Sequence, residues 1–315
     1  MPCSRWRFGA AWSFILGLCC VCAQALAQPA SSRILVDTGV GYEVQTSPLF
    51  QISPDSTVQY QDGTQSLRGT HATLNLQASA DWVWSEGIST SLAANAVVKR
   101  SVDAPGLEFN SLGLMPSIHR PVGAWSLGLA GNFQVLDIAG QRFRDVQGAQ
   151  FNLTQANDDG MWGMVLDLAS YTHPGPLADL DAQAASLVLI RQINRPFAGV
   201  DGLDFSAIVG RERNVHDYAD LSQRSAMFST AVRWSAWGAQ WSLGHSWRHA
   251  QFDDTLFAGE VPRADRTDMT DISAQWPLND TLSMRVEVND VRNHSTTHLY
   301  DNVYQQLSVS LQAVF

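Results

Sequence analysis

The sequence predicts an all-β protein: a transmembrane up-and-down antiparallel β-barrel of about 14 strands. Three observations favour this fold class. The chain begins with an export signal, it then repeats a strand-length unit of alternating polarity, and it ends on an amphipathic strand closed by an aromatic residue. Exported chains that cross a membrane with strands rather than helices form closed barrels, because no backbone polar group stays unpaired in a closed sheet.

Residues 1–27 are typical of a secretory signal peptide. Arg5 and Arg7 precede the apolar run 8–21, and Ala25-Leu26-Ala27 supplies a small-residue cleavage site. A transmembrane anchor is the alternative, but the run is short for a span and a cleavage motif follows it. We expect cleavage after Ala27, which leaves residues 28–315 as the barrel domain.

Composition excludes several function classes for the exported chain. All four cysteines lie within 1–27, so neither disulfides nor thiol chemistry is expected. The signal also carries two of the 20 basic residues and none of the 30 acidic ones, so 18 basic residues face 30 acidic ones at a net charge of −12. This acidity argues against nucleic acid or anionic phosphate as the main partner. No later stretch has the roughly 18 apolar residues of a membrane helix.

The strands follow from alternating polarity, taken in chain order. The first strand, about 33–44, leads into a long polar loop, 45–67. The second, 73–84, is the clearest, because Leu74 and Leu76 lie on one face and Asn75 lies on the other. Gly and Asn/Asp turns separate the later strands. They are expected at about 91–99, 109–119, 125–135, 144–155, 161–172, 182–192, 203–213, 226–234, 241–247, 268–277, 282–288 and 304–315.

The last strand has Leu307, Val309 and Leu311 on one face and Ser308 and Ser310 on the other, and it ends at Phe315. A terminal aromatic strand of this kind resembles the insertion signal of bacterial outer-membrane barrels, so Phe315 is assigned that role. A soluble sandwich could also end on an amphipathic strand. The export signal at the front favours the membrane barrel.

Tryptophans gather near the expected short turns, which is the placement of a membrane-interface girdle. Tryptophans of a soluble sandwich core are the alternative, although such long, regularly paired strands favour closure into a barrel. The interface aromatics are Trp82, Trp84, Trp125, Trp234, Trp237, Trp241 and Trp276.

The same register turns a set of ionisable side chains toward the lumen. These residues either form a mixed-charge lining that pairs its own charges or set the selectivity of a permeation path. A barrel of fourteen strands lies between filled and open barrels in width, so loops could plug it. The expected lumen-lining residues are Asp81, Lys99, His119, Asp167, Asp204, Arg233, Arg248, Arg285 and Glu287.

Catalytic and metal sites are poorly supported. His245 and His249 share one strand face and Ser246 lies on the other, so they cannot form a nucleophile and base pair. Ser295 and His298 lie in a loop where a hydrolase site is conceivable, but spacing specifies no acid partner. No histidine group has metal-ligand spacing, so no metal, cofactor or catalytic residue is predicted.

Residues of the C-terminal third carry a resemblance. Phe257-Ala-Gly259, Arg263-Ala-Asp265, Asn293-His-Ser295, Tyr300-Asp301 and the Phe-terminated strand resemble the barrel end of surface lipoprotein assembly modifiers and related tetratricopeptide-linked porins. Asp37-Thr-Gly-Val-Gly-Tyr-Glu-Val-Gln is loosely similar to the first strand of that domain. The resemblance implies a fourteen-stranded pore. The periplasmic helical repeats that precede the family's barrel have no counterpart here.

The sequence therefore predicts a pore or translocation channel in the outer membrane of a Gram-negative bacterium, and not an enzyme. Export of lipoprotein or another substrate to the cell surface is one version of this prediction. The alternatives are a structural or adhesive barrel that binds ligands through loops 45–67 and 252–266, and a lipid-modifying barrel enzyme. Expected partners are outer-membrane lipid, the barrel assembly machinery, and a periplasmic partner or exported substrate, with no nucleic acid.

Overall fold

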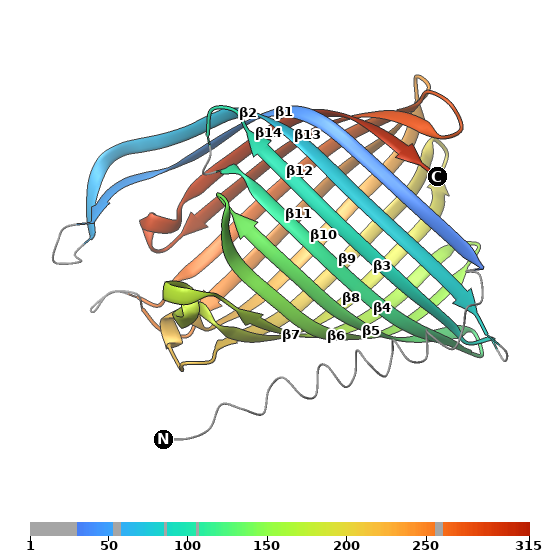
Figure 1. The fold of residues 1–315 in the computed structure, drawn as a ribbon, viewed down its shortest axis with the longest axis horizontal. Helices are drawn as coiled ribbons and strands as arrows, with labels where there is room; N and C mark the ends of the chain where they lie inside the picture. The colour runs from blue at the N-terminus through green and yellow to red at the C-terminus, as the bar shows by residue number, and fades with distance from the viewer. Residues whose placement is uncertain (1–29, 53–57, 85–86, 105–106, 256–260) are drawn as a thin grey trace.

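The computed structural model describes residues 30–52, 58–84, 87–104, 107–255 and 261–315. They form a single closed barrel of fourteen antiparallel strands, in which each strand pairs with its chain neighbours and β1 pairs with β14 (Figure 1). The predicted fold class and strand number are confirmed. Within these ranges no helix is long and apolar enough to cross a membrane.

The described residues contain fourteen strands and three short 3-10 helices. The strands are β1 Ser31–Ile52, β2 Val58–Val83, β3 Ser89–Ser101, β4 Phe109–Val122, β5 Trp125–Ile138, β6 Gln141–Asn157, β7 Gly160–Thr172, β8 Ala182–Phe197, β9 Val200–Asn214, β10 Gln223–Ala236, β11 Ala239–Phe252, β12 Ala264–Pro277, β13 Leu282–Ser295 and β14 Asn302–Val314. The helices are η3 Gly175–Leu180, η4 Ala219–Leu221 and η5 His298–Tyr300.

The barrel closes where the first strand meets the last. Backbone pairing runs from Leu35 opposite Val314 to Thr46 opposite Val303. The backbone N–H of Phe315 donates to the carbonyl of Ile34, and Phe315 accepts from Ile34 in return, both at 2.9 Å. No sheet edge is left open along this seam, which removes the unpaired edge groups that a membrane would not tolerate.

Connection length distinguishes the two ends of the barrel. Five of the six connections at the end where β1 begins and β14 ends join strands within two to four residues, and the sixth spans 84–88. The turn Trp237-Gly238 has φ of 53° and 72°, the left-handed pair that two-residue hairpins need. Six of the seven connections at the other end span five to eleven residues, the exception being the two-residue turn 139–140, and this end also carries the helices η3, η4 and η5. We call these the turn end and the loop end.

The segment 45–67 is not the polar loop that the sequence predicted. β1 continues to Ile52 and β2 begins at Val58, and the two strands pair from Thr46 opposite Ser66 to Ile52 opposite Val58. Figure 1 shows the resulting ribbon reaching beyond the barrel rim. The prediction failed because loss of the apolar face marks where a strand leaves lipid, whereas backbone pairing continues beyond that point.

The remaining strands were predicted in order and are longer at one or both ends, with 226–234 extended to Gln223–Ala236 and 241–247 to Ala239–Phe252. The signal peptide 1–27 lies outside the described residues and stays a prediction.

Polarity is inverted relative to a soluble protein. The exposed large hydrophobic side chains follow the outward register of the strands, for example Leu307 and Leu311 on β14 and Leu127 on β5. The buried apolar residues are mostly alanines, and the largest fully buried side chains are His71, Glu43 and Asn214. The wall therefore turns its apolar face outward and its polar face inward, as a transmembrane barrel requires.

Candidate functional site

The lumen wall is the candidate site, because it is where ionisable side chains converge from many strands. Strand pairing puts all nine sequence-predicted lumen residues on the register opposite the apolar outer face. Asp81 pairs with Ser91, Lys99 with Phe109, His119 with Gly128, Asp167 with Ser186, Asp204 with Ala231, Arg233 with Ser242, Arg248 with Thr267, Arg285 with Ser310 and Glu287 with Ser308.

Two ion pairs link predicted lumen residues to each other. Arg233 on β10 donates through Nε and Nη2 to the Asp204 carboxylate on β9, at 2.9 and 3.2 Å. Arg285 lies 2.6 Å from Glu287, two residues along β13 on the same face. Arg248 donates to the Gln223 side-chain oxygen at 3.3 Å. Mutual pairing thus neutralises part of the lumen charge, which is the first of the two roles that the sequence left open.

Carboxylates outnumber basic side chains on the inward register of the described strands. The nine carboxylates are Asp37, Glu43, Asp81, Asp167, Asp204, Glu212, Asp265, Asp271 and Glu287. The six arginine and lysine side chains are Arg33, Lys99, Arg144, Arg233, Arg248 and Arg285. This excess of negative charge favours cations inside the barrel.

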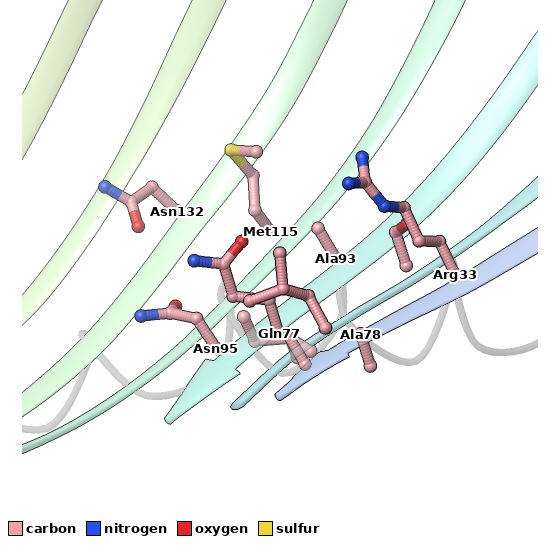
Figure 2. A pocket seen from close by; sticks show the side chains of 11 residues that line it. Arg33, Gln77, Ala78, Ala93, Asn95, Met115 and Asn132 are labelled. Carbon is pink, nitrogen blue, oxygen red and sulfur yellow. The ribbon is translucent and has the colours of Figure 1, made fainter. Parts of the chain in front are cut away.

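Charge is unevenly distributed around the wall. β2 to β6 present mainly neutral amides and small residues, whereas the pairs of Asp204 and Glu287 lie on β9 to β13. A cavity of about 310 Å³ lies against the neutral side, where Arg33 is the one charged lining residue (Figure 2). Gln77, Asn95 and Asn132 surround it with amide groups that both donate and accept hydrogen bonds.

A buried cluster at the closure seam was missed from the sequence. Glu43 on β1 is 0% exposed and forms an ion pair with Lys99 on β3. Its second oxygen lies 3.5 Å from the His71 ring of β2, and the Tyr304 hydroxyl of β14 lies 2.9 Å from Oε2. Gln306 closes the group, 3.0 Å from His71. Four strands on both sides of the seam are therefore joined through one carboxylate.

The inward parity of Glu43, His71 and Lys99 on three consecutive strands was the available signal for this cluster. The cluster could be identified only once the strand register was known, because a shift of one residue would separate the three side chains.

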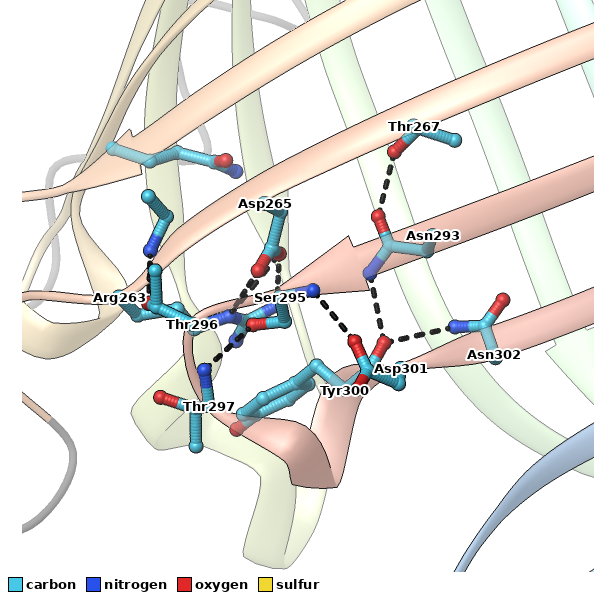
Figure 3. A network of polar contacts seen from close by, with 12 residues as sticks. Arg263, Asp265, Thr267, Asn293, Ser295, Thr296, Thr297, Tyr300, Asp301 and Asn302 are labelled. Carbon is cyan, nitrogen blue, oxygen red and sulfur yellow. Dashed lines mark hydrogen bonds and ion pairs between the residues drawn. The ribbon is translucent and has the colours of Figure 1, made fainter. Parts of the chain in front are cut away.

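Part of the family resemblance lies in residues that meet at the loop end (Figure 3). Arg263 donates to Asp265 at 2.5 to 3.1 Å, and its guanidinium lies 3.2 Å from the centre of the Tyr300 ring. Asn293 donates to the Tyr300 carbonyl at 2.7 Å, and the backbone N–H of Ser295 donates to Asp301 at 2.6 Å. These contacts fasten the β11–β12 and β13–β14 connections together. Phe257-Ala-Gly259 lies outside the described residues.

This network gives Ser295 and Asp301 structural roles. The Ser295 hydroxyl accepts the Thr297 backbone N–H at 3.1 Å. Asp301 holds the Ser295 N–H with one oxygen and the His298 ring, 2.8 Å away, with the other. Among the described residues no group of three metal-ligating side chains occurs.

The predicted interface aromatics lie at the turn end on the outward register. Trp241 stacks on Trp234 at 6.1 Å between ring centres, and Trp237 and Trp276 meet it edge-on at 5.8 and 6.0 Å. Trp237 is 86% exposed at the tip of its turn. Trp84 donates to the Thr90 hydroxyl at 2.9 Å, while Trp82 and Trp125 lie in outward positions of β2 and β5.

Two further outward tryptophans were not included in the predicted set. Trp162 on β7 is 55% exposed under the Arg191 guanidinium, 4.7 Å from its ring. Trp247 on β11 lies nearer the loop end and stacks on His249 at 6.1 Å. Their outward parity within strands was the available signal.

No family model matches this sequence, and no curated protein is similar to it. Several solved structures resemble this barrel. They include an anion-selective porin from Comamonas acidovorans (TM-score 0.47, 10% identity, covering 90% of this chain and 99% of that one) and OccAB4 of Acinetobacter baumannii (0.44, 8%, 91% and 99%). A loop-deletion mutant of Vibrio cholerae OmpT scores 0.47 at 7% identity, with coverages of 90% and 99%. Because these identities and TM-scores are low, the barrel architecture of this chain is established by its own strand pairing.

Proposed function

We propose that this chain is an outer-membrane pore that passes small polar solutes and prefers cations. The observation that carries the proposal is a closed barrel whose outer face is apolar and whose inner face is lined by ionisable and amide side chains from most of its strands. The end where β1 begins and β14 ends has short turns, and the other end has longer connections apart from the turn 139–140. This asymmetry matches the periplasmic and extracellular ends of bacterial barrels.

Single-channel recording tests this proposal. Residues 28–315, refolded and inserted into a planar bilayer, are expected to give steady ohmic steps with a reversal potential that favours K⁺ over Cl⁻. A preparation that is folded, as judged by heat-modifiable mobility, and yet electrically silent would overturn the diffusion pore. It would instead favour a gated translocation channel, in which a periplasmic partner or an exported substrate, including a lipoprotein, opens the lumen.

A binding role at the loop end is the second candidate, and the β1–β2 ribbon favours it. The ribbon extends paired backbone beyond the rim, where it can meet a ligand outside the membrane (Figure 1). Replacing residues 47–65 with a two-residue turn would abolish surface binding in this case and leave conductance unchanged. A pore without an adhesive function would show no loss of binding in the same variant.

The lipid-modifying enzyme is the weakest version of the function. Ser295 and Asp301 form hydrogen bonds within the loop-end network, and His298 is bonded to Asp301 at the exposed edge of that network. Unchanged lipid composition in cells that carry His298→Ala is the expected outcome, and loss of a lipid modification in those cells would contradict it.

A further inference from the structure

A dense patch of basic side chains lies on the outer face of β9 to β13, close to the loop end. The patch consists of Arg211, Arg213, Arg224, His249, Arg266, Arg292 and His294. All of them occupy the outward register, so none faces the lumen. The arginine side chains are between 55% and 69% exposed.

The depth of this patch follows from the tryptophans at the turn end. Arg224 lies ten residues from Trp234 along β10, and Arg266 lies ten residues from Trp276 along β12. Ten residues of a strand tilted by about 45° rise by about 23 Å, close to the apolar band of a bacterial barrel. The patch is therefore at the height of the lipid headgroups in the outer leaflet. Trp247, one outward position below His249, marks the same interface.

Strand pairing places basic side chains directly opposite one another. Arg211 on β9 is the partner of Arg224 on β10. Arg266 on β12 lies opposite His249 of β11 on one side and His294 of β13 on the other, two side chains that carry a positive charge only when protonated. Like charges in directly opposed positions destabilise a sheet unless an anion lies between them.

Four carboxylates lie beside the patch and neutralise only part of its positive charge. Asp253 is shared by Arg211 at 3.2 Å and Arg224 at 3.8 Å. Asp217, Asp268 and Asp290 each bind one arginine, at 2.6, 3.2 and 2.8 Å. Each guanidinium has five N–H donors in a planar fork, so most donors on these exposed side chains point to the surrounding solvent or headgroups.

We infer that this patch is a binding site for the phosphorylated glycolipid of the outer leaflet. Arginine forks recognise phosphate oxygens in bidentate fashion. Trp247, its strand partner Phe228 on β10 and Leu243 further down β11 offer apolar surface to the acyl chains. The inference rests on the membrane placement of the barrel and is independent of whether the lumen conducts. It also differs from the expectation drawn from net charge, because an acidic chain concentrates its basic residues in one place.

Binding of lipid A, the bisphosphorylated glucosamine lipid, to the folded chain 28–315 in detergent tests the site. Each arginine near a lipid surface strengthens binding to anionic headgroups by roughly fivefold. Arg211→Gln/Arg224→Gln/Arg266→Gln is expected to weaken lipid A binding by about a hundredfold, and Arg224→Gln alone by about fivefold. An affinity for lipid A within twofold of the unmodified chain in both variants would overturn the inference.

Two further probes separate phosphate recognition from other sources of binding. Lipid A stripped of both phosphates should bind the unmodified chain far more weakly, and equal binding would contradict a phosphate site. Phosphatidylglycerol should also bind the unmodified chain more weakly than lipid A does. Equal affinity for the two lipids would show a general preference for anionic lipid and would contradict the site.

The matched control is Arg100→Gln, which removes an outward arginine at the loop end of β3, away from the patch and bonded to Asn110 at 2.7 Å. It should leave lipid A affinity unchanged, and a loss as large as that of Arg224→Gln would overturn the localisation. Conductance of the same preparations keeps the two proposals apart, because a silent barrel that binds lipid A contradicts only the pore.

Discussion

At the residue scale, Gly41 shows how the seam depends on a missing side chain. A Cβ built at this position would meet the His71 ring and the Leu307 carbonyl, both at 2.6 Å. His71 can therefore lie over the β1 backbone and face Glu43 only because residue 41 is glycine. The cluster around Glu43 and the closure of the barrel share this constraint.

Gly41→Ala should destabilise the barrel by about 1 to 3 kcal/mol, the usual range for overpacking a tight site. Urea unfolding of the refolded chain, followed by tryptophan fluorescence, measures the change. Gly163→Ala is the matched control, because its Cβ would meet Ile190 and Thr154 at an ordinary 3.5 and 3.6 Å. Equal unfolding midpoints for the two variants would contradict the packing argument.

Glu43 and Lys99 form a buried pair, so removing either partner leaves the other charge uncompensated away from water. Glu43→Gln and Lys99→Met are each expected to cost about 3 to 5 kcal/mol of unfolding free energy, and the double variant should recover a large part of this loss. A double-mutant cycle by urea unfolding measures the coupling.

The control for the Glu43 cycle is Arg142→Gln, which breaks an exposed pair with Asp145 and should cost about 1 kcal/mol or less. Additive losses in the Glu43 and Lys99 variants would show that the two side chains do not act as a pair.

At the element scale, period-two polarity was sufficient to locate every strand, because each strand has one face in lipid. It failed for the ends of β1 and β2, where Thr46 and Ser66 give no apolar signal while their backbones still pair. Barrel register also had to be known before Glu43, His71 and Tyr304 could be placed together, since they are separated by up to 261 residues along the chain. The loop-end network, by contrast, was anticipated as a motif whose structural role only the contacts revealed.

The residue that follows β14, Phe315, offers a test of assembly. Phe315 contributes two backbone hydrogen bonds to Ile34 and a side chain that is 70% exposed on the outer face. Deleting Phe315 is expected to lower the yield of heat-modifiable barrel in the outer membrane, because both the pairing and the aromatic end of the strand are lost. Cell fractionation followed by gel mobility measures the yield.

Phe315→Ala separates these two causes, since it keeps the backbone pairing with Ile34 and removes only the aromatic ring. We expect it to lower the yield almost as much as the deletion does. Full assembly of Phe315→Ala would mean that the backbone bonds, and not the aromatic side chain, carry the signal.

At the scale of the whole molecule, net charge conceals two opposite surfaces. Carboxylates predominate on the lumen wall, whereas the outer face of β9 to β13 gathers arginines such as Arg211 and Arg224. The excess of acid over base in the chain therefore predicts a cation-preferring interior without excluding a phosphate-bearing partner outside. Which face a charge occupies, set by strand parity, decides its function.

Selectivity should respond to single lumen charges in a direction set by their sign. Asp167→Asn is expected to reduce the K⁺ to Cl⁻ permeability ratio by about fourfold, and Arg248→Gln to raise it by a similar factor, because a unit charge about 10 Å away in water changes the energies of K⁺ and Cl⁻ by about 0.4 kcal/mol each, in opposite directions. Reversal potentials under a salt gradient measure the ratio. Asp217→Asn, which removes a carboxylate from the outer face near the rim, should leave the ratio unchanged. Shifts of the permeability ratio that are equal in size in all three variants would indicate that ions sense the net charge of the whole barrel rather than the charge of its lumen.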